Sequence, residues 1–416
     1  MTTPSDPSIT INDHIGRILL RYFRKAFGVE IGRPRLDLSR DMEMLRLHWS
    51  MSPALRELTA YVLANRHETQ SFLSSREHVE DGVIRGRLDA RATIIRRMAT
   101  GHPTATVTQE PVRSFASGAN QVVAWVLEQA WRLSARFLSL LPEETGYRDA
   151  VEANVLSLER VRRIDAIRTA MSETNLAGRP RGGALQQAVR SRRMMYRLAY
   201  KAFMDLVAVE TGDLEVIGRM LQATLLGPLE TWQRFELAVG LSLAEGLEQS
   251  MGEPAVLSLL RADNKEPIAR IGRFAIFWQT RTNLYQEPVA EPSEAIVKRI
   301  LLAYGLSPSG DRPDLVVVDA EAGSVVAVVE VKFFSGEAED NLGRVREATT
   351  QLVRYGRGYG PVSELDALLG RSIIAVIRNA VPMPVPRPPN VPLIVDFEGI
   401  KRGQLTSWAD NLYALA

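Results

Sequence analysis

The sequence predicts an α/β protein, because helical patterns fill most of the chain and a strand-rich segment closes it. In the first two thirds, apolar residues recur mainly at three- and four-residue steps, which is the spacing of an amphipathic helix. After Pro267, short β-branched runs alternate with helical patterns, which is typical of a mixed sheet flanked by helices. A chain of 416 residues is too long for one compact core, so we expect two or three domains.

Residues 1–178 are expected to form a mixed α/β domain. Helices are predicted over 9–28 and 53–66, and a strand over 104–109. A strongly helical stretch follows over 117–170, in which Asn120 is placed to start a long helix. The run Arg-Pro-Arg-Gly-Gly at 179–183 interrupts the pattern and is interpreted as a loop or linker.

Residues 184–266 are expected to form a helical middle region, with helices over 184–209 and 214–247. Apolar residues share one face of the second helix, which favours a packing role: Trp232, Phe235, Val239 and Leu243. The first helix carries a basic face around Ser191–Arg193. A solvated surface is the simpler interpretation of that face, and contact with DNA is the alternative.

Residues 267–416 are expected to form a sheet domain. The predicted strands are 273–280, 315–318, 325–331, 373–377 and 393–396, and the predicted helices are 292–304 and 342–355. Prolines crowd the segment 381–392, which predicts an extended connector because proline cannot donate to a strand ladder.

Composition excludes several classes of protein. The chain has no cysteine, which excludes disulfides and thiolate zinc sites and is compatible with a cytoplasmic location. The polar N-terminus and the lack of a long uncharged apolar stretch predict no export and no contact with membrane. Net charge is only +2, so a nucleic-acid surface would have to be a local patch. No GxxxxGK[ST] loop occurs, so NTP hydrolysis by that route would need another subunit.

The residues with a chemical signal lie in a predicted hairpin between Arg312 and Lys332. Two β-branched runs flank a short turn that contains Gly323. A turn centred near Ala322 places Asp314 opposite Glu330, with Cβ atoms ~5 Å apart. Because side chains alternate along a strand, Lys332 shares the face of Glu330.

Two like charges on an apolar sheet are costly unless a cation neutralises them. Oxygen ligands without histidine or cysteine select a hard ion, Mg²⁺ or Mn²⁺. Such an ion can polarise a phosphodiester and lower the pKa of a bound water, while Lys332 orients that water. A solvated hairpin without chemistry is the alternative. Asp319 and Glu321 are expected to be solvated residues of the turn.

This stretch resembles the PD-(D/E)XK nuclease superfamily, through Pro313-Asp314 and Glu330-Val331-Lys332. The resemblance implies that Asp314, Glu330 and the backbone carbonyl of Val331 bind the metal and that Lys332 assists the nucleophile.

A second element of the resemblance lies in the following helix. Gln351 and Tyr355 look like the QxxxY element of the RecB-like subgroup, on one helical face. Glu294 stands where many relatives carry a further acidic ligand, although Glu287 and Glu291 are close by.

Fainter similarity to McrC-like restriction subunits covers most of the chain. The segments that carry it, in order, are Ile84–Thr93, Phe115–Asn120, Arg160–Asp165, Trp232–Glu236 and Arg312–Asp314. The resemblance implies an N-terminal domain that docks on a partner NTPase ring and a C-terminal domain that cuts DNA. Glu330 departs from the aspartate common in such proteins, but both acids coordinate metal.

The leading hypothesis is therefore a cytoplasmic, Mg²⁺- or Mn²⁺-dependent DNA endonuclease subunit of a restriction or phage-defence system. An AAA-type NTPase encoded nearby would recruit or activate it, and a homo- or hetero-oligomer is compatible with the sequence. The alternatives are a non-catalytic DNA-binding or NTPase-activating subunit that retains the fold, and a nuclease of DNA repair or of RNA.

Overall fold

The computed structural model describes residues 7–27, 38–141, 146–258, 266–288, 296, 299–300, 303, 312–334, 338–378 and 387–415. The protein is α/β and consists of two compact units that interleave along the chain. Unit 1 comprises 1–44, 139–148 and 212–416, and unit 2 comprises 45–138 and 149–211. The three consecutive ranges predicted from the sequence follow linear order, which cannot show which distant helices pack together. Their functional assignment stays a prediction.

Unit 1 is built on a mixed sheet of seven strands in the order β10-β9-β8-β7-β6-β5-β4. The strands are β4 (Val256–Leu257), β5 (Ala269–Ile271), β6 (Phe274–Trp278), β7 (Leu315–Asp319), β8 (Ser324–Lys332), β9 (Ile373–Val376) and β10 (Leu393–Asp396). Neighbours from β4 to β8 are antiparallel, whereas β8, β9 and β10 are parallel. The expected strands of the C-terminal segment are confirmed, while the short β4 and β5 were not predicted.

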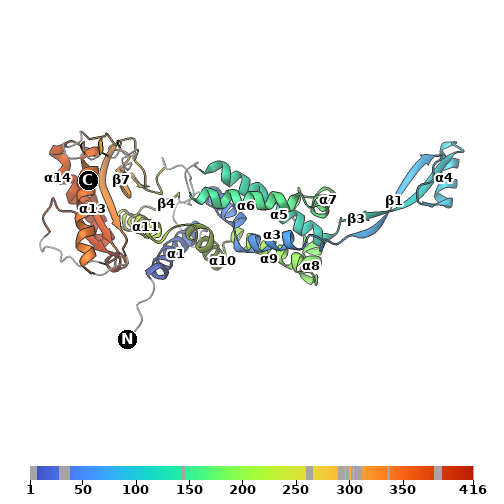
Figure 1. Ribbon diagram of the computed structural model, residues 1–416, viewed down its shortest axis with the longest axis horizontal. Helices are drawn as coiled ribbons and strands as arrows, with labels where there is room; N and C mark the ends of the chain where they lie inside the picture. Colours follow the sequence, from blue (N-terminus) through green and yellow to red (C-terminus); the bar gives the residue numbers. More distant parts are fainter. Residues whose placement is uncertain are drawn as a thin grey trace, which may run out of the picture. The chain divides into compact units, whose positions relative to one another are not determined.

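Helices cover both faces of this sheet (Figure 1). On one face, Val316 and Val328 pack in a core with Leu352 of α13 (Ala338–Tyr359). On the other, Gly240 of α11 (Thr231–Met251) lies so close to Leu315 that an added Cβ would come within 3.0 Å of it. This cover explains the continuous valine runs of β7 and β8, because a strand buried on both faces has no polar alternation.

The remaining elements of unit 1 are mostly short helices around the sheet. They are α1 (Pro7–Ala26), α10 (Leu214–Leu221), the π-helical turn η1 (Gln222–Leu226), the 3₁₀ turn η2 (Val362–Glu364), α14 (Leu365–Arg371), α15 (Phe397–Lys401) and α16 (Gln404–Leu415). The single helix predicted over 214–247 is wrong: it breaks around Pro228, whose ring and missing N–H stop a helix. Glu230 and Gln233 then form a capping box that starts α11.

The predicted hairpin of β7 and β8 is confirmed. Leu315 pairs with Val329, and the register shifts at a bulge between Val317 and Val318. Gly323 takes φ +62° in the turn, a conformation that favours glycine. The expectation that Asp319 is solvated is wrong. Asp319 is buried. Its Oδ1 accepts from the turn amides of Glu321 and Ala322, both at 3.0 Å, and these bonds replace the water that the carboxylate has lost.

Unit 2 combines a group of helices with a three-stranded sheet of order β1-β3-β2. The strands are β1 (Phe72–Asp81), β2 (Arg87–Leu88) and β3 (Ala105–Ser114), and the helices are α3 (Pro53–Ala64), α4 (Ala90–Thr100), α5 (Gly118–Leu140), α7 (Asp165–Glu173), α8 (Gly182–Arg190) and α9 (Met194–Glu210). Among the described helices, three cross the division between the units: α2 (Leu38–Ser50), the last two residues of α5, and α6 (Gly146–Arg162). The β1–β3 ribbon leaves the helices and carries α4 near its end (Figure 1).

The sequence did not predict β1, because most of its residues are exposed and its stability comes from backbone pairing with β3 rather than from an apolar face. It also placed the start of the long helix two residues late. α5 begins at Gly118, with the Ser117 hydroxyl accepting from the Asn120 amide at 3.2 Å. The Asn120 side chain instead binds distant backbone, as described below.

Two predicted elements fall largely outside the described residues: the helix over 292–304, and the centre of the proline-rich connector, 379–386. Among the helices that are described, none has both the length and the apolar character needed to cross a membrane.

Candidate active site

The strand ends of the hairpin bring Asp314 and Glu330 together. Asp314 directly precedes β7, and one step beyond the Leu315–Val329 pair the register places it opposite Glu330. Its Oδ2 accepts from the Val331 amide at 2.7 Å, and its carbonyl accepts from the Gln279 amide at 2.8 Å. Asp314 is therefore fixed by β8 on one side and by the end of β6 on the other.

Lys332 joins this pair on the same face of β8. Its Nζ lies 2.7 Å from Oε1 of Glu330 and 3.8 Å from Oε1 of Glu347 on α13. The Glu330 side chain is 2% exposed and that of Lys332 is 16% exposed, so the ion pair is largely shielded from water. The structure thus brings the three residues of the predicted chemical core to one place.

A third buried acid, Glu236 of α11, belongs to the same cluster. Its Oε2 accepts from Trp278 Nε1 at 2.8 Å and from Gln279 Nε2 at 2.7 Å. It lies close enough to Asp314 and Glu330 for their charges to affect one another. We call Asp314, Glu330, Glu236 and Lys332 the carboxylate site.

Glu236 belongs to the segment Trp232–Glu236 of the McrC-like resemblance, but no role was predicted for it. A signal was present: from Phe235 to Ala244, all buried, Glu236 is the only charged residue. A lone acid in a buried apolar run is expensive and therefore calls for a partner.

Gln279 connects the parts of the site and was not predicted. It has φ 48°, the one positive value of a non-glycine residue in the described part of the chain. Besides its bonds to Asp314 and Glu236, its Oε1 accepts from Arg312 at 3.3 Å. Such a backbone conformation costs roughly 1–3 kcal/mol and tends to persist where surrounding structure holds it, often at functional sites.

Burial dominates the electrostatics of the three acids. It raises the pKa of Asp314, of Glu330 and of Glu236. For Glu330 and Glu236, the nearby Asp314 carboxylate raises the pKa further. The Val331 amide, Lys332 and Arg312 oppose the shift at Asp314. One lysine and one arginine do not neutralise three carboxylates, so the site favours either bound protons or an additional cation.

The donor set is suited to a hard divalent ion. Oε2 of Glu330 is buried and receives no hydrogen bond, which leaves a lone pair free for a cation. No group of three or more histidine, aspartate or glutamate side chains among the described residues is arranged to hold a metal. A pair of carboxylates is nevertheless enough for Mg²⁺, which keeps several waters and commonly takes one or two protein carboxylates together with substrate phosphates.

The other residues predicted for the site have different outcomes. Gln351 follows Glu347 by one turn of α13, and its Oε1 is buried without a hydrogen bond. Tyr355 is buried in the core between α13 and the sheet, so packing accounts for its position. Glu294 lies outside the described residues. The roles predicted for these three residues, and for the Val331 carbonyl, stay predictions.

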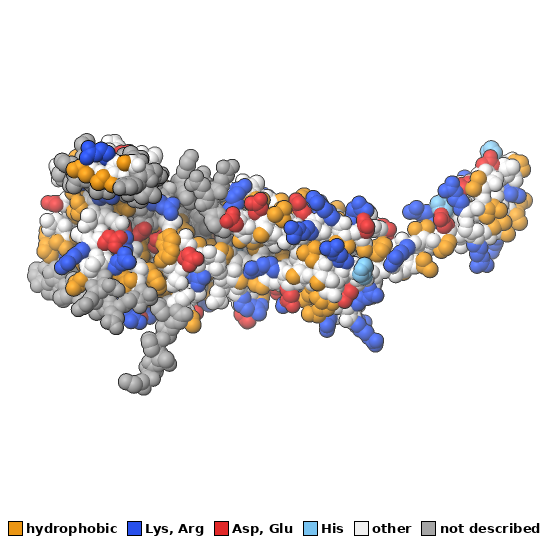
Figure 2. Space-filling model, in the orientation of Figure 1, with side chains coloured by type: hydrophobic (Ala, Val, Ile, Leu, Met, Phe, Trp, Pro, Cys, Tyr) orange, Lys and Arg blue, Asp and Glu red, His pale blue; other side chains and the backbone are white. Residues whose placement is uncertain are grey.

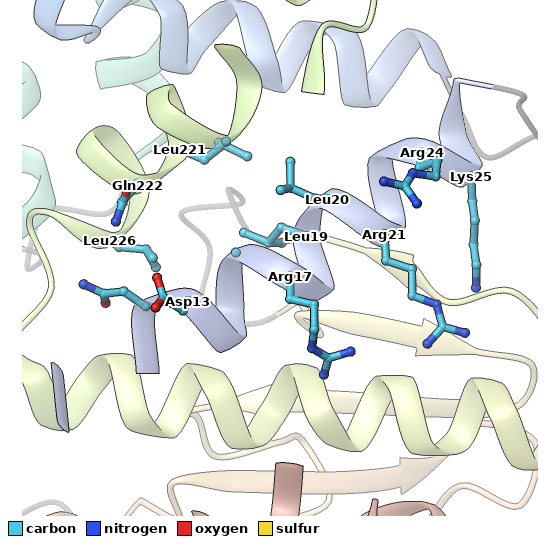
Figure 3. A pocket seen from close by; sticks show the side chains of 13 residues that line it. Asp13, Arg17, Leu19, Leu20, Arg21, Arg24, Lys25, Leu221, Gln222 and Leu226 are labelled. Carbon is cyan, nitrogen blue, oxygen red and sulfur yellow. The ribbon is translucent and has the colours of Figure 1, made fainter. Parts of the chain in front are cut away.

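A cavity of about 710 Å³ in unit 1 is separate from this site. It lies along α1, α10 and η1 and includes none of the four residues of the carboxylate site. Figure 3 shows Leu20 and Leu221 pointing into the space between the helices. Of its four basic residues, Arg17, Arg21 and Lys25 form ion pairs with α11, so most of the positive charge that lines it is used within the fold.

Comparison with known proteins adds little to this picture. No family model matches the chain, and no curated protein matches it. It aligns with a chain of a solved structure, the refined half-complex from the tetradecameric assembly of Thermococcus gammatolerans McrB AAA+ hexamers with bound McrC. That alignment covers 97% of this chain and 76% of the other, at 12% identity and a TM-score of 0.22. A TM-score at that level does not establish a common fold.

Proposed function

We propose that this protein is a metal-dependent nuclease that hydrolyses phosphodiester bonds of DNA, with Asp314 and Glu330 holding Mg²⁺ or Mn²⁺. The observation that supports it most is the buried carboxylate pair at the strand ends of one hairpin, beside a lysine. The residues are those expected from the resemblance to PD-(D/E)XK nucleases, and a mixed sheet flanked by helices is the fold expected with them.

A bound ion would supply Lewis-acid polarisation of the scissile phosphate and a water of lowered pKa. The chain supplies the charge and the positioning around it. Burial alone would lower the pKa of Lys332, but Glu330, Asp314 and Glu347 together raise it. Lys332 is therefore a permanent cation that can hold a water or a phosphate oxygen by hydrogen bonds. Glu236, through Trp278 and Gln279, keeps the end of β6 against Asp314.

Recruitment by an AAA-type NTPase is the second part of the proposal, and it rests on the McrC-like resemblance. The end of the β1–β3 ribbon offers a surface for such a partner, because apolar side chains are exposed there together with basic ones (Figure 2). The exposed apolar residues are Val83, Ile84, Leu88, Ile94, Ile95 and Met98. Large apolar residues exposed side by side commonly mark a protein interface. A cytoplasmic role in restriction or phage defence follows from the same resemblance.

Lys332→Ala tests the catalytic part of the proposal. The rate of Mg²⁺-dependent cleavage of plasmid DNA by this variant should fall at least ~100-fold, because removing one electrostatic contact to the reacting group typically slows an enzyme by that factor. Its fold should remain, since the lysine sits at a strand end. Cleavage is measured with and without EDTA, on DNA and RNA side by side, and with the NTPase partner added.

Lys201→Ala is the matched control, because Lys201 is an exposed lysine of unit 2 paired with Glu57 at 3.5 Å. This control should cut like the wild type. Undiminished cleavage by Lys332→Ala would refute the assignment. Metal-independent binding without any cleavage by the wild type would favour the non-catalytic alternative.

A further inference from the structure

In unit 2, two segments that contribute no residue to the carboxylate site lie side by side. Phe115, which directly follows β3, and part of Arg160–Asp165, which runs from the end of α6 to the start of α7, line one cleft of about 710 Å³. The segment after α3, from Arg66 to Thr69, forms another wall. Both meeting segments were singled out in the sequence, and the proposed catalytic chemistry gives neither of them a role.

The cleft is basic. Four arginines and one histidine line it, all exposed: Arg66, Arg113, Arg160, Arg163 and His67. We call it the arginine cleft. Its one acid, Asp165, already bonds Arg168 at 2.7 Å, so the lining carries a clear excess of positive charge.

Two arginines of the cleft each donate one hydrogen bond within the fold: Arg66 to the Leu63 carbonyl at 3.3 Å and Arg113 to the Ser71 hydroxyl at 2.7 Å. Arg160 and Arg163 are used much less. Arg162, in the same run, shows the contrast, since it stacks 3.8 Å from the ring centroid of Trp131 and pairs with Glu128 at 3.0 Å. Among the described residues, Arg160 has no ion pair. Arg163 has only Glu159, at 4.0 Å, and its side chain is 82% exposed. These two are therefore free to bind an anion.

The N-terminus of α7 opens onto the same cleft, since Ile164, Asp165 and Ala166 line it. Ile164 occupies the N-cap position and has no side chain that can accept from the first amides of this nine-residue helix. Free amides at a helix N-terminus favour a bound anion, and here they add to the arginines rather than stand alone.

The walls of the cleft are held rigidly from behind. Glu173, at the end of α7, accepts from the Phe115 amide at 2.6 Å and from the Ser114 hydroxyl at 3.0 Å. The buried Asn120 amide group donates to the carbonyls of Gln70 and Phe115, both at 2.7 Å. The arginines therefore project from a preorganised frame, which lowers the entropic cost of binding.

We propose that the arginine cleft binds phosphate groups of a nucleic-acid backbone. A guanidinium group can bind two phosphate oxygens at once. The arginines of the cleft come from several elements and are exposed, an arrangement that suits an extended chain of phosphates better than one small anion. Phe115, the aromatic residue of the lining, is only 9% exposed, so the cleft offers little to an apolar peptide side chain. The choice of duplex DNA as the strand rests on the proposed function.

The test is binding of a short labelled DNA duplex, followed by fluorescence anisotropy in EDTA at several salt concentrations. Arg160→Gln/Arg163→Gln should raise Kd about tenfold or more. It should also reduce the slope of log K against log salt by about 1.8, because each lost phosphate contact removes about 0.9. Arg160→Lys/Arg163→Lys keeps both charges and should largely keep the slope.

Arg56→Gln/Arg190→Gln is the matched control, since it removes the same charge from exposed positions of unit 2 outside the cleft. Equal losses in the control and in the cleft variant would overturn the inference, and so would a wild type without salt-dependent binding. The assay is run without metal and does not depend on cleavage. Loss of binding in the cleft variant would therefore stand even if the wild type proved unable to cut.

Discussion

At the scale of single residues, the divalent cation proposed for the site would compete with protons for the same carboxylates. Burial raises the pKa of Glu330 and of Asp314, so without metal the folded protein holds protons more tightly than the unfolded chain. A cation that takes their place must displace them. Metal affinity is therefore expected to rise with pH, and metal binding to release protons.

The same shift predicts how Glu330 affects stability. When folding raises the pKa of a carboxyl group, that group's contribution to stability is fully present at low pH. The contribution is lost as pH rises through the raised pKa. In metal-free protein at pH 8, Glu330→Gln should therefore raise the free energy of unfolding by ~1 kcal/mol or more. Urea denaturation at pH 5 and pH 8 measures this, and the gain should shrink at the lower pH.

Glu321→Gln, at an exposed turn position of the same hairpin, controls for the loss of one negative charge and should change little. A Glu330→Gln variant that is less stable than the wild type at pH 8 would contradict the prediction. It would mean that the ion pair with Lys332 outweighs the cost of burying the acid.

At the scale of secondary-structure elements, Gln279 ties the end of β6 to α11 and to the start of β7. Its side chain bonds Glu236 and Arg312, while its backbone bonds Asp314. Three elements that are distant in sequence thus share one residue with an unfavourable φ. The strain is offset by this set of hydrogen bonds.

Substitutions at Gln279 can separate the strain from the bonding. Gln279→Ala keeps the strained φ and loses both side-chain bonds, so it should lower stability and cut activity about tenfold through misplacement of Asp314. Gln279→Gly loses the same bonds but relieves the strain, and should be about 1 kcal/mol more stable than the alanine variant. Urea denaturation and plasmid cleavage measure the two effects, and equal stabilities would argue against strain at this position.

What the sequence predicted well were local elements. The hairpin register followed from two β-branched runs and one turn, so Asp314 and Glu330 could be paired without knowledge of the fold. Glu236 could not be placed, because its approach depends on how α11 packs across the sheet. The strand β1 escaped prediction for a related reason: its pairing with β3 is tertiary, and its own pattern carries no apolar face.

At the scale of the whole molecule, each unit contains one buried histidine. His14 of unit 1 bonds the Ser242 hydroxyl at 2.8 Å, and burial lowers its pKa to about 4. His48 of unit 2 is fully buried against Phe137, and burial lowers its pKa to about 3. Neither histidine takes part in the proposed chemistry, but each is protonated less readily in the folded chain than in the unfolded chain.

Mild acid should therefore weaken both units. A histidine pKa lowered by folding means that the unfolded chain binds more protons, so stability is complete above the unfolded value of 6.5 and is lost as pH falls toward 4. At pH 5, each histidine should cost about 2 kcal/mol relative to neutral pH. His48→Gln should reduce this acid-dependent loss in denaturant unfolding, whereas the exposed His67→Gln should not. An unchanged loss in His48→Gln would contradict the assignment.

The interleaving of the units also bears on how the chain matures on the ribosome. α1 is translated well before α11, but it packs along that helix and pairs through Arg17 with its Glu245. All of unit 2 is translated before α11, so unit 2 can fold while α1 still lacks the helix against which it packs. A C-terminal fragment beginning at residue 267, however well it matches the strand-rich segment of the sequence, would lack both helices and the Glu236 carboxylate.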